Sequence, residues 1–67
     1  MTKAKQIIKA WAAREGRKIT WLAASVPMDR SHLSSCMAGR YVPREVYRNR
    51  IAAVVGDNGL CDKGAWE

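Results

Sequence analysis

The 67-residue sequence predicts an all-α fold of four to five short helices. Two observations support this prediction: apolar residues recur at helical spacing, and capping or terminating residues bracket the segments in which they recur. A third observation, the absence of an internal repeat, a low-complexity segment or a separate linker, predicts one domain over residues 1–67. Its core is expected within about residues 4–56, with residues 57–67 as a tail.

The first predicted helix covers residues 2–15. Thr2 can cap it and Gly16 can end it. Its apolar residues follow the i, i+3, i+4, i+7, i+8 pattern of an amphipathic helix and are Ala4, Ile7, Ile8, Trp11 and Ala12. The basic residues Lys3, Lys5, Lys9 and Arg14 fall largely on the other side, where they are expected to keep that face hydrated.

A second helix is expected to begin at Thr20 as its N-cap, with Ile19 packing across its entrance. Leu22, Ala23 and Val26 would face the core, and the small side chain of Ala23 would allow a close crossing with the next helix. Pro27 should stop this helix, because proline lacks an N–H and disfavours helical dihedral angles at the residue before it, Val26.

Asp29 is a strong N-cap for a third helix that ends at Gly39. Leu33, Cys36 and Met37 are spaced to face inward, whereas the side chains expected to point outward are Arg30, Ser31, Ser34 and Ser35. Two helices joined by so short a turn form a helix-turn-helix unit, whose second helix can lie in the major groove of DNA.

A fourth helix is expected over residues 43–55, with Pro43 at its first position and Gly56 as its terminator. Its predicted core side consists of Val46, Tyr47, Ile51, Val54 and Val55, which leaves Arg44, Arg48 and Asn49 for solvent or a ligand. In the tail, Leu60 and Trp66 could either fold back to close the core or meet a second subunit.

The formal net charge of +6 is unevenly distributed. Residues 1–50 carry eleven Lys and Arg against three Asp and Glu, whereas residues 51–67 carry one against three. A basic surface attracts polyanions, of which nucleic acid is the commonest for a cytoplasmic protein. On charge alone, a merely hydrated basic face is the competing interpretation.

Several classes of protein find little support. Two cysteines, Cys36 and Cys61, fit neither a disulfide-dense secreted domain nor a redox motif. The longest apolar run, residues 51–55, is far shorter than a membrane span. No nucleophile–base pair or metal-ligand set is evident, although His32 and Cys36 stand at a helical spacing that can hold a metal. We therefore expect a cytoplasmic protein that is not an enzyme and has no cofactor, metal or small-molecule ligand.

The chain resembles the lambda-repressor-like helix-turn-helix family over roughly residues 4–56. The matching residues, in family order, are Leu22-Ala23, Val26, Met28, Asp29, Arg30-Ser31-His32, Leu33, Gly39, Arg40 and Pro43. It departs from the family at Pro27, where a left-handed glycine is common, and at Cys36, where a larger residue is common. Because proline cannot adopt a positive φ, the turn must be built differently here and the third helix could be aimed off the usual angle.

The resemblance implies a set of DNA contacts. Base contacts would come from Arg30, Ser31, Ser34 and Ser35, and phosphate contacts from Thr20, His32, Arg40, Tyr41, Arg44 and Arg48, with Arg17 and Lys18 as second-rank candidates. The Arg30 guanidinium could bond O6 and N7 of guanine together. Alternatively it could contact a phosphate or pair with Asp29.

The function expected on this basis is a transcriptional regulator, most simply a repressor, with autorepression as one form. It is expected to bind an inverted-repeat double-stranded DNA operator as a homodimer in a bacterial cytoplasm. Its size is similar to that of phage and mobile-element regulators, including those encoded beside anti-CRISPR genes. One alternative is a protein-binding helix-turn-helix module, an inhibitor or anti-activator, anchored by Trp21, Tyr41 and Trp66. Another alternative is an RNA-binding protein.

Overall fold

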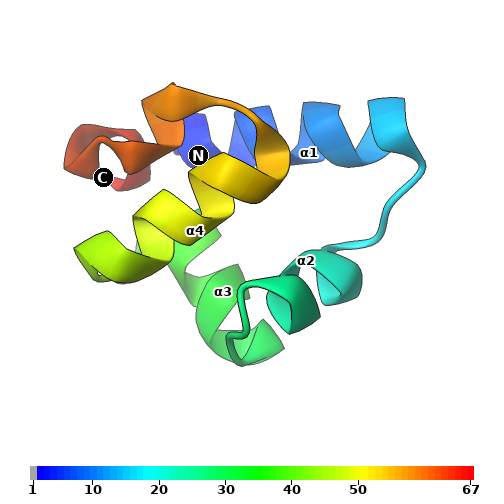
Figure 1. The fold of residues 1–67 in the computed structure, drawn as a ribbon. Coiled ribbons are helices and arrows are strands. Elements are labelled where there is room, and N and C mark those ends of the chain that lie inside the picture. The colour runs from blue at the N-terminus through cyan, green and yellow to red at the C-terminus, as the bar shows by residue number, and fades with distance from the viewer. Residues whose placement is uncertain (1) are drawn as a thin grey trace.

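The computed structural model describes residues 2–67, and within them it contains helices and no strand, as the sequence predicts (Figure 1). The four α-helices and two short 3-10 helices are α1 (Lys3–Glu15), α2 (Ile19–Ser25), α3 (Arg30–Met37), α4 (Glu45–Val55), η1 (Asn58–Cys61) and η2 (Lys63–Trp66). The all-α prediction is confirmed.

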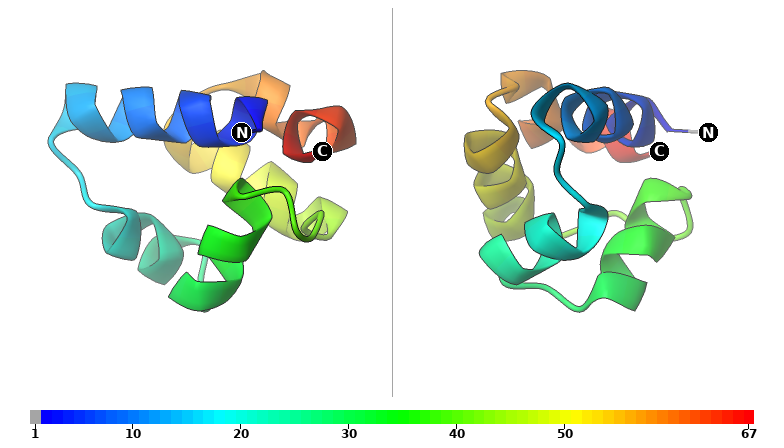
Figure 2. Two further views of the ribbon diagram at one scale, coloured as in Figure 1. Left: turned by 180° about the vertical axis from the view of Figure 1, so that it is seen from behind. Right: turned by 90° about the vertical axis from the view of Figure 1, so that its right-hand side faces the viewer.

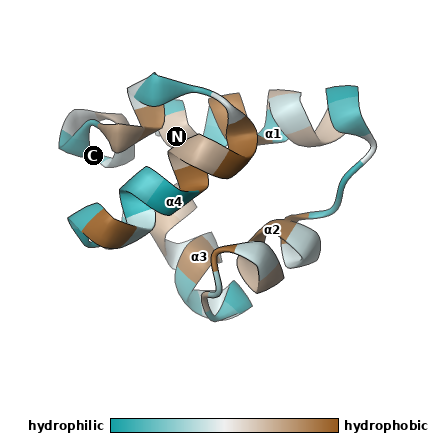
Figure 3. Cartoon of the chain, viewed as in Figure 1, coloured by the Kyte–Doolittle hydropathy of each residue, from teal (hydrophilic) through white to brown (hydrophobic). Residues whose placement is uncertain are grey.

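The helices are arranged around one core in two layers joined by α4. In Figures 1 and 2, α1 and the C-terminal segment η1–η2 lie on one side of the molecule, and α2 and α3 lie on the other. The helix α4 crosses from the α3 side to the C-terminal segment, and its second half is the more hydrophobic (Figure 3). This arrangement places the α2–α3 pair at one edge of the domain, away from the chain's C-terminus.

Both ends of α1 are capped as predicted. The Thr2 hydroxyl accepts a hydrogen bond from the Lys5 backbone N–H at 3.0 Å. It also donates one to the carbonyl oxygen of Met37 at 2.6 Å, which joins the start of α1 to the end of α3. At the other end, Gly16 has a φ of 65°, the left-handed conformation in which a helix commonly ends.

The helix α2 differs from the prediction at its start. It begins at Ile19, Lys18 is its N-cap without a side-chain hydrogen bond, and Thr20 lies within the first turn. The expectation that Thr20 would cap this helix is therefore wrong. The reason is that the Lys18 carbonyl already accepts from the N–H of Trp21, at 3.0 Å, which closes a helical turn before Thr20 could serve as a cap.

The turn between α2 and α3 contains no left-handed residue, as Pro27 requires. No non-glycine residue in the described chain has a positive φ, and the turn is closed by the Met28 N–H, which donates to the Ala23 carbonyl at 2.6 Å. The expectation that Pro27 would push Val26 out of the helical region is wrong: Val26 has φ −73° and ψ −23°. Val26 is buried in the core and its N–H bonds Leu22, and these contacts outweigh the steric preference before proline.

The helix α3 begins as predicted, because the Asp29 carboxylate accepts a hydrogen bond from the Ser31 N–H at 2.8 Å. Its inward side chains, Leu33, Cys36 and Met37, are all buried. Gly39 follows the helix with a φ of 89°. The core face expected for this helix is therefore confirmed.

The helix α4 begins two residues later than predicted, at Glu45, with Arg44 as N-cap and a buried Pro43 before it. Ile51 and Val55 are buried as expected, and Tyr47 and Val54 are partly buried. Val46 is 49% exposed, so its assignment to the core side is wrong. At 3.6 residues per turn it lies about 140° around the helix from Ile51, on the outer surface.

The C-terminal segment closes the core from within the same chain. Leu60, Ala65 and Trp66 are buried, and the Trp66 indole N–H donates to the Leu60 carbonyl at 2.9 Å. Of the two alternatives for this tail, folding back over the core is the one found. Trp66 is therefore not an exposed anchor for a partner.

Candidate nucleic-acid interface

The outer face of α3 is the centre of the candidate interface. Leu33, Cys36 and Met37 fix the opposite face in the core, and this leaves Arg30, Ser31 and Ser34 exposed. Ser35, the fourth residue predicted to contact bases, is only partly exposed. The structure thus brings three polar side chains to the surface within the first five residues of one rigid element.

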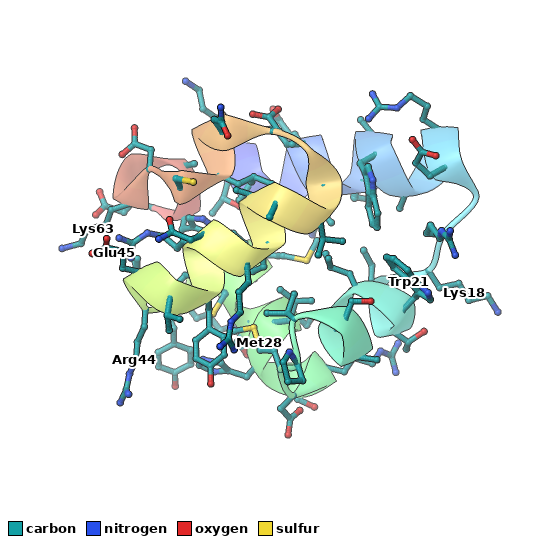
Figure 4. The ribbon with its side chains drawn as sticks, viewed as in Figure 1. Lys18, Trp21, Met28, Arg44, Glu45 and Lys63 are labelled. Carbon is teal, nitrogen blue, oxygen red and sulfur yellow. The ribbon has the colours of Figure 1, made fainter. Side chains whose placement is uncertain are left out.

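One flank of α3 is formed by the loop that leads to α4. The rings of His32 and Tyr41 lie 6.1 Å apart at a tilt of 34°, and Tyr41 is 60% exposed. Arg40 and Arg44 are exposed in the same stretch, and Figure 4 shows the Arg44 side chain extending away from the domain. These four residues, His32, Arg40, Tyr41 and Arg44, were all predicted to contact phosphate, and we call them the loop flank.

Arg48 differs from the other predicted phosphate contacts. Its guanidinium donates to the Pro43 carbonyl at 2.7 Å and to the Cys61 carbonyl at 3.0 Å, and the side chain is partly buried. These bonds hold the start of α4 and the C-terminal segment together. Nothing in the local sequence indicates this role, because it depends on the tail folding back against α4.

The other flank of α3 faces α1 and the start of α2. Thr20, Arg17 and Lys18, predicted as phosphate contacts, are exposed there. The Arg17 guanidinium lies 4.3 Å from the ring centroid of Trp21, which is 41% exposed and close enough for a cation–π contact. Trp21 in turn lies 6.0 Å from Trp11, which is buried as the sequence predicts.

Lysines from α1 complete this second flank, and sequence reasoning missed them. Lys9 and Arg30 line the same hollow together with Lys18, and Lys5 joins Lys9, Arg30 and Ser34 in a neighbouring hollow. From the sequence, Lys5 and Lys9 are expected only to keep one face of α1 hydrated, because their proximity to Arg30 depends on the tertiary fold. The spacing within α1 alone contains no such signal.

The positive charge of this surface is largely unneutralised within the chain. In residues 2–67 the one ion pair joins Arg14 to Glu15 at 3.8 Å, and it lies on α1 away from α3. Arg30 therefore does not pair with Asp29, whose carboxylate serves as the helix cap. The acids Asp57 and Asp62 cap η1 and η2 on the C-terminal side of the molecule.

The cysteines and the histidine show no metal-binding arrangement. The Cys36 Sγ and His32 Nε2 atoms are 3.8 Å apart, and no group of three or more His, Cys, Asp or Glu side chains in residues 2–67 could hold a metal ion. Burial raises the pKa of the Cys36 thiol, which keeps it protonated at neutral pH. Cys36 thus packs as a small core side chain, as predicted.

In the described part of the chain, no helix combines the length and apolar character needed to cross a bilayer.

Comparisons of the sequence and structure with protein-family models, curated proteins and solved structures find no significant match in any of the three.

Proposed function

We propose that this protein is a sequence-specific double-stranded DNA-binding regulator, in which α2 and α3 act as a helix-turn-helix of the lambda-repressor-like type. The observation that carries the proposal is the outward presentation of Arg30, Ser31 and Ser34 on a helix whose opposite face is buried. Cations that form no ion pair within residues 2–67 border this helix on both flanks.

The dimensions of α3 suit the major groove. An α-helix with its side chains is about 10–12 Å across, and the groove is about 12 Å wide. The short hydroxyls of Ser31 and Ser34 allow close approach to base edges, and Arg30 supplies a planar fork for guanine O6 and N7, a contact worth about 1–3 kcal/mol of discrimination. Ser35, which is partly covered, would contribute less.

The loop flank would hold the sugar-phosphate backbone beside α3. Arg40 and Arg44 provide cations, and Tyr41 and His32 provide donors for phosphate oxygens. Arg48 is left out of this set, because its guanidinium already donates to two backbone carbonyls.

We propose further that the regulator acts as a homodimer on an inverted repeat in a bacterial cytoplasm and represses a promoter, such as its own, by occupying it. The exposed apolar side chains Val42 and Val46 support a protein contact beside the loop flank, because they stand two residues before and two residues after Arg44 and lie on the surface. Two α3 helices related by a two-fold axis would then reach major grooves about 34 Å apart.

A salt titration on matched nucleic acids tests this proposal. Binding to duplex DNA should weaken steeply as salt rises, because each neutralised phosphate contributes a log–log slope of about −0.9. Replacing Arg44 by Gln should weaken binding to all duplexes alike, whereas Lys63→Gln, on the C-terminal segment and outside the predicted contacts, is the charge-matched control.

Two outcomes would overturn the proposal. Stronger binding to RNA of matched sequence than to the duplex would indicate an RNA-binding protein. Binding to neither nucleic acid would favour a protein-binding module, for which Trp21 and Tyr41 are the exposed aromatic anchors.

A further inference from the structure

A basic groove runs between α1 and the α2–α3 pair. It consists of two adjoining hollows of about 370 and 250 Å³ that share Lys9, Ile19 and Arg30. Its cations come from α1, from the link to α2 and from α3, and they are Lys5, Lys9, Arg17, Lys18 and Arg30. We call this feature the α1 groove.

The α1 groove differs in charge from two hollows elsewhere on the molecule. No acidic residue lines either of its two parts. By contrast, the hollow between Lys3 and the C-terminal segment includes Asp62, and the hollow beside Arg14 includes Asp57. Close-set cations without a counterion repel one another, so an anion that enters the α1 groove relieves that repulsion.

The position of the α1 groove relative to α3 indicates which anion it fits. Arg30 and Ser34 line it, so it follows one flank of α3, whereas His32 and Tyr41 mark the loop flank. A helix lying in the major groove has one phosphate backbone on each side. From this we infer that the α1 groove seats the sugar-phosphate backbone of one DNA strand while the loop flank holds the other.

The lining suits a phosphodiester chain chemically. Lys9 on α1 and Lys18 before α2 supply ammonium groups from two elements, and the Thr20 hydroxyl supplies a further donor. Ile19, partly buried, and Ala12 give the groove an apolar surface that a deoxyribose can contact. This inference rests on the proposed function and adds α1 to the DNA-contacting surface.

Lysine-to-glutamine variants of the full chain test the α1 groove. Lys9→Gln and Lys18→Gln each remove one charge from it, and Lys63→Gln removes one from the opposite end of the molecule, as the positions of Lys18 and Lys63 in Figure 4 show. Affinity for one duplex, selected by the unmodified protein, is measured from about 50 to 200 mM salt. Circular dichroism shows that each variant is folded.

The groove predicts a shallower salt dependence for the two groove variants alone. Each should lower the magnitude of the log–log slope by about 0.9, and Lys63→Gln should leave the slope unchanged. In a second experiment, the charged phosphodiester linkages of one DNA strand at a time are replaced by neutral methylphosphonate linkages. Neutralising the contacted strand should weaken the unmodified protein more than it weakens Lys9→Gln, because that variant has already lost one of the contacts.

The outcomes separate this inference from the proposed function. If the unmodified protein binds no duplex, the proposed function fails and the groove inference fails with it. Alternatively, the unmodified protein binds a selected duplex, but Lys9→Gln and Lys18→Gln change the slope of its salt dependence no more than Lys63→Gln does. In that case the proposed function stands and the α1 groove does not bind the sugar-phosphate backbone.

Discussion

Arg48 is the side chain whose role depends most on the tertiary fold. It donates to the carbonyls of Pro43 and Cys61 and so ties the loop before α4 to the C-terminal segment. Hydrogen bonds from a charged donor contribute about 1.5–3 kcal/mol each, and breaking them leaves buried or partly buried carbonyls unpaired.

Replacing Arg48 by Gln should therefore lower the free energy of unfolding by roughly 1–3 kcal/mol. Urea denaturation measures this change. The affinity of the folded Arg48→Gln variant for duplex DNA should keep the salt dependence of the unmodified protein. By contrast, Arg44→Gln should retain its free energy of unfolding and show a shallower slope of log affinity against log salt concentration. The opposite pattern for Arg48→Gln, full stability with a shallower slope, would return this arginine to the phosphate contacts.

Cys36 offers a second test at the level of a single residue. Its side chain is fully buried and burial raises the pKa of its thiol, so that little reactive thiolate is present at neutral pH. Cys61 is partly exposed and serves as an internal reference.

Iodoacetamide should consequently label Cys61 before Cys36 in the native protein, and the two at comparable rates in denaturant. Peptide mass spectrometry reads the order. Equal labelling in the native state would mean that the core around α3 opens freely.

Among the elements, α1 and α3 are joined by Thr2, whose hydroxyl caps α1 and donates to Met37 at the end of α3. Thr2 is also almost fully buried, and its methyl carbon is 3.2 Å from where a Cβ on Gly39 would lie. Thr2 therefore sits where the beginning of one helix meets the end of another.

Thr2→Val keeps the shape but removes the hydroxyl, and should cost about 1–2 kcal/mol. In a domain of this size each kcal/mol lowers Tm by roughly 4–8 °C. Thr2→Ser, which keeps the hydroxyl, is the matched control and should lose less. A Tm for Thr2→Val equal to that of the unmodified protein would show that the α1–α3 connection does not depend on this bond.

At the scale of the elements, the sequence predicted those helix ends that depend on neighbouring residues. The caps at Thr2 and Asp29 and the terminators Gly16 and Gly56 act within a few residues, so their patterns predicted α1, α3 and the end of α4. The error at Val26 arose where tertiary packing decides, because this residue keeps helical dihedral angles while buried in the core. The same holds for the candidate interface. Arg30 could be predicted from the sequence of α3 alone, whereas Lys9 lines the same hollow as Arg30 only because of how the chain folds.

At the scale of the whole molecule, the fold places basic and acidic residues in different parts of the domain. The α2–α3 pair, with Arg17, Lys18 and Arg30 on or beside it, lies on one side, and Asp57 and Asp62 lie with the C-terminal segment on the other. Such polarity would orient the domain toward a polyanion before contact. Two exposed apolar side chains, Val42 and Val46, stand two residues before and two residues after Arg44 of the loop flank.

If a second copy covers this apolar surface, Val46→Asp should prevent dimerisation by placing a charge in the contact. Sedimentation should then give a monomer where the unmodified protein gives a dimer. Val46 is half exposed on α4, so the variant should fold normally. Because a monomer meets only one half-site, its affinity for an inverted repeat should fall to that for a single half-site. An unchanged dimer would place the contact elsewhere.

The most direct test of the central claim is selection of bound fragments from a random duplex DNA pool, run in parallel with the unmodified protein and with Arg30→Ala. We predict an enriched motif of two-fold symmetry with half-sites about 10 base pairs apart, and a loss of preference at one base pair of each half-site in the variant. No enriched motif, or a motif that Arg30→Ala leaves unchanged, would contradict the account that α3 reads DNA.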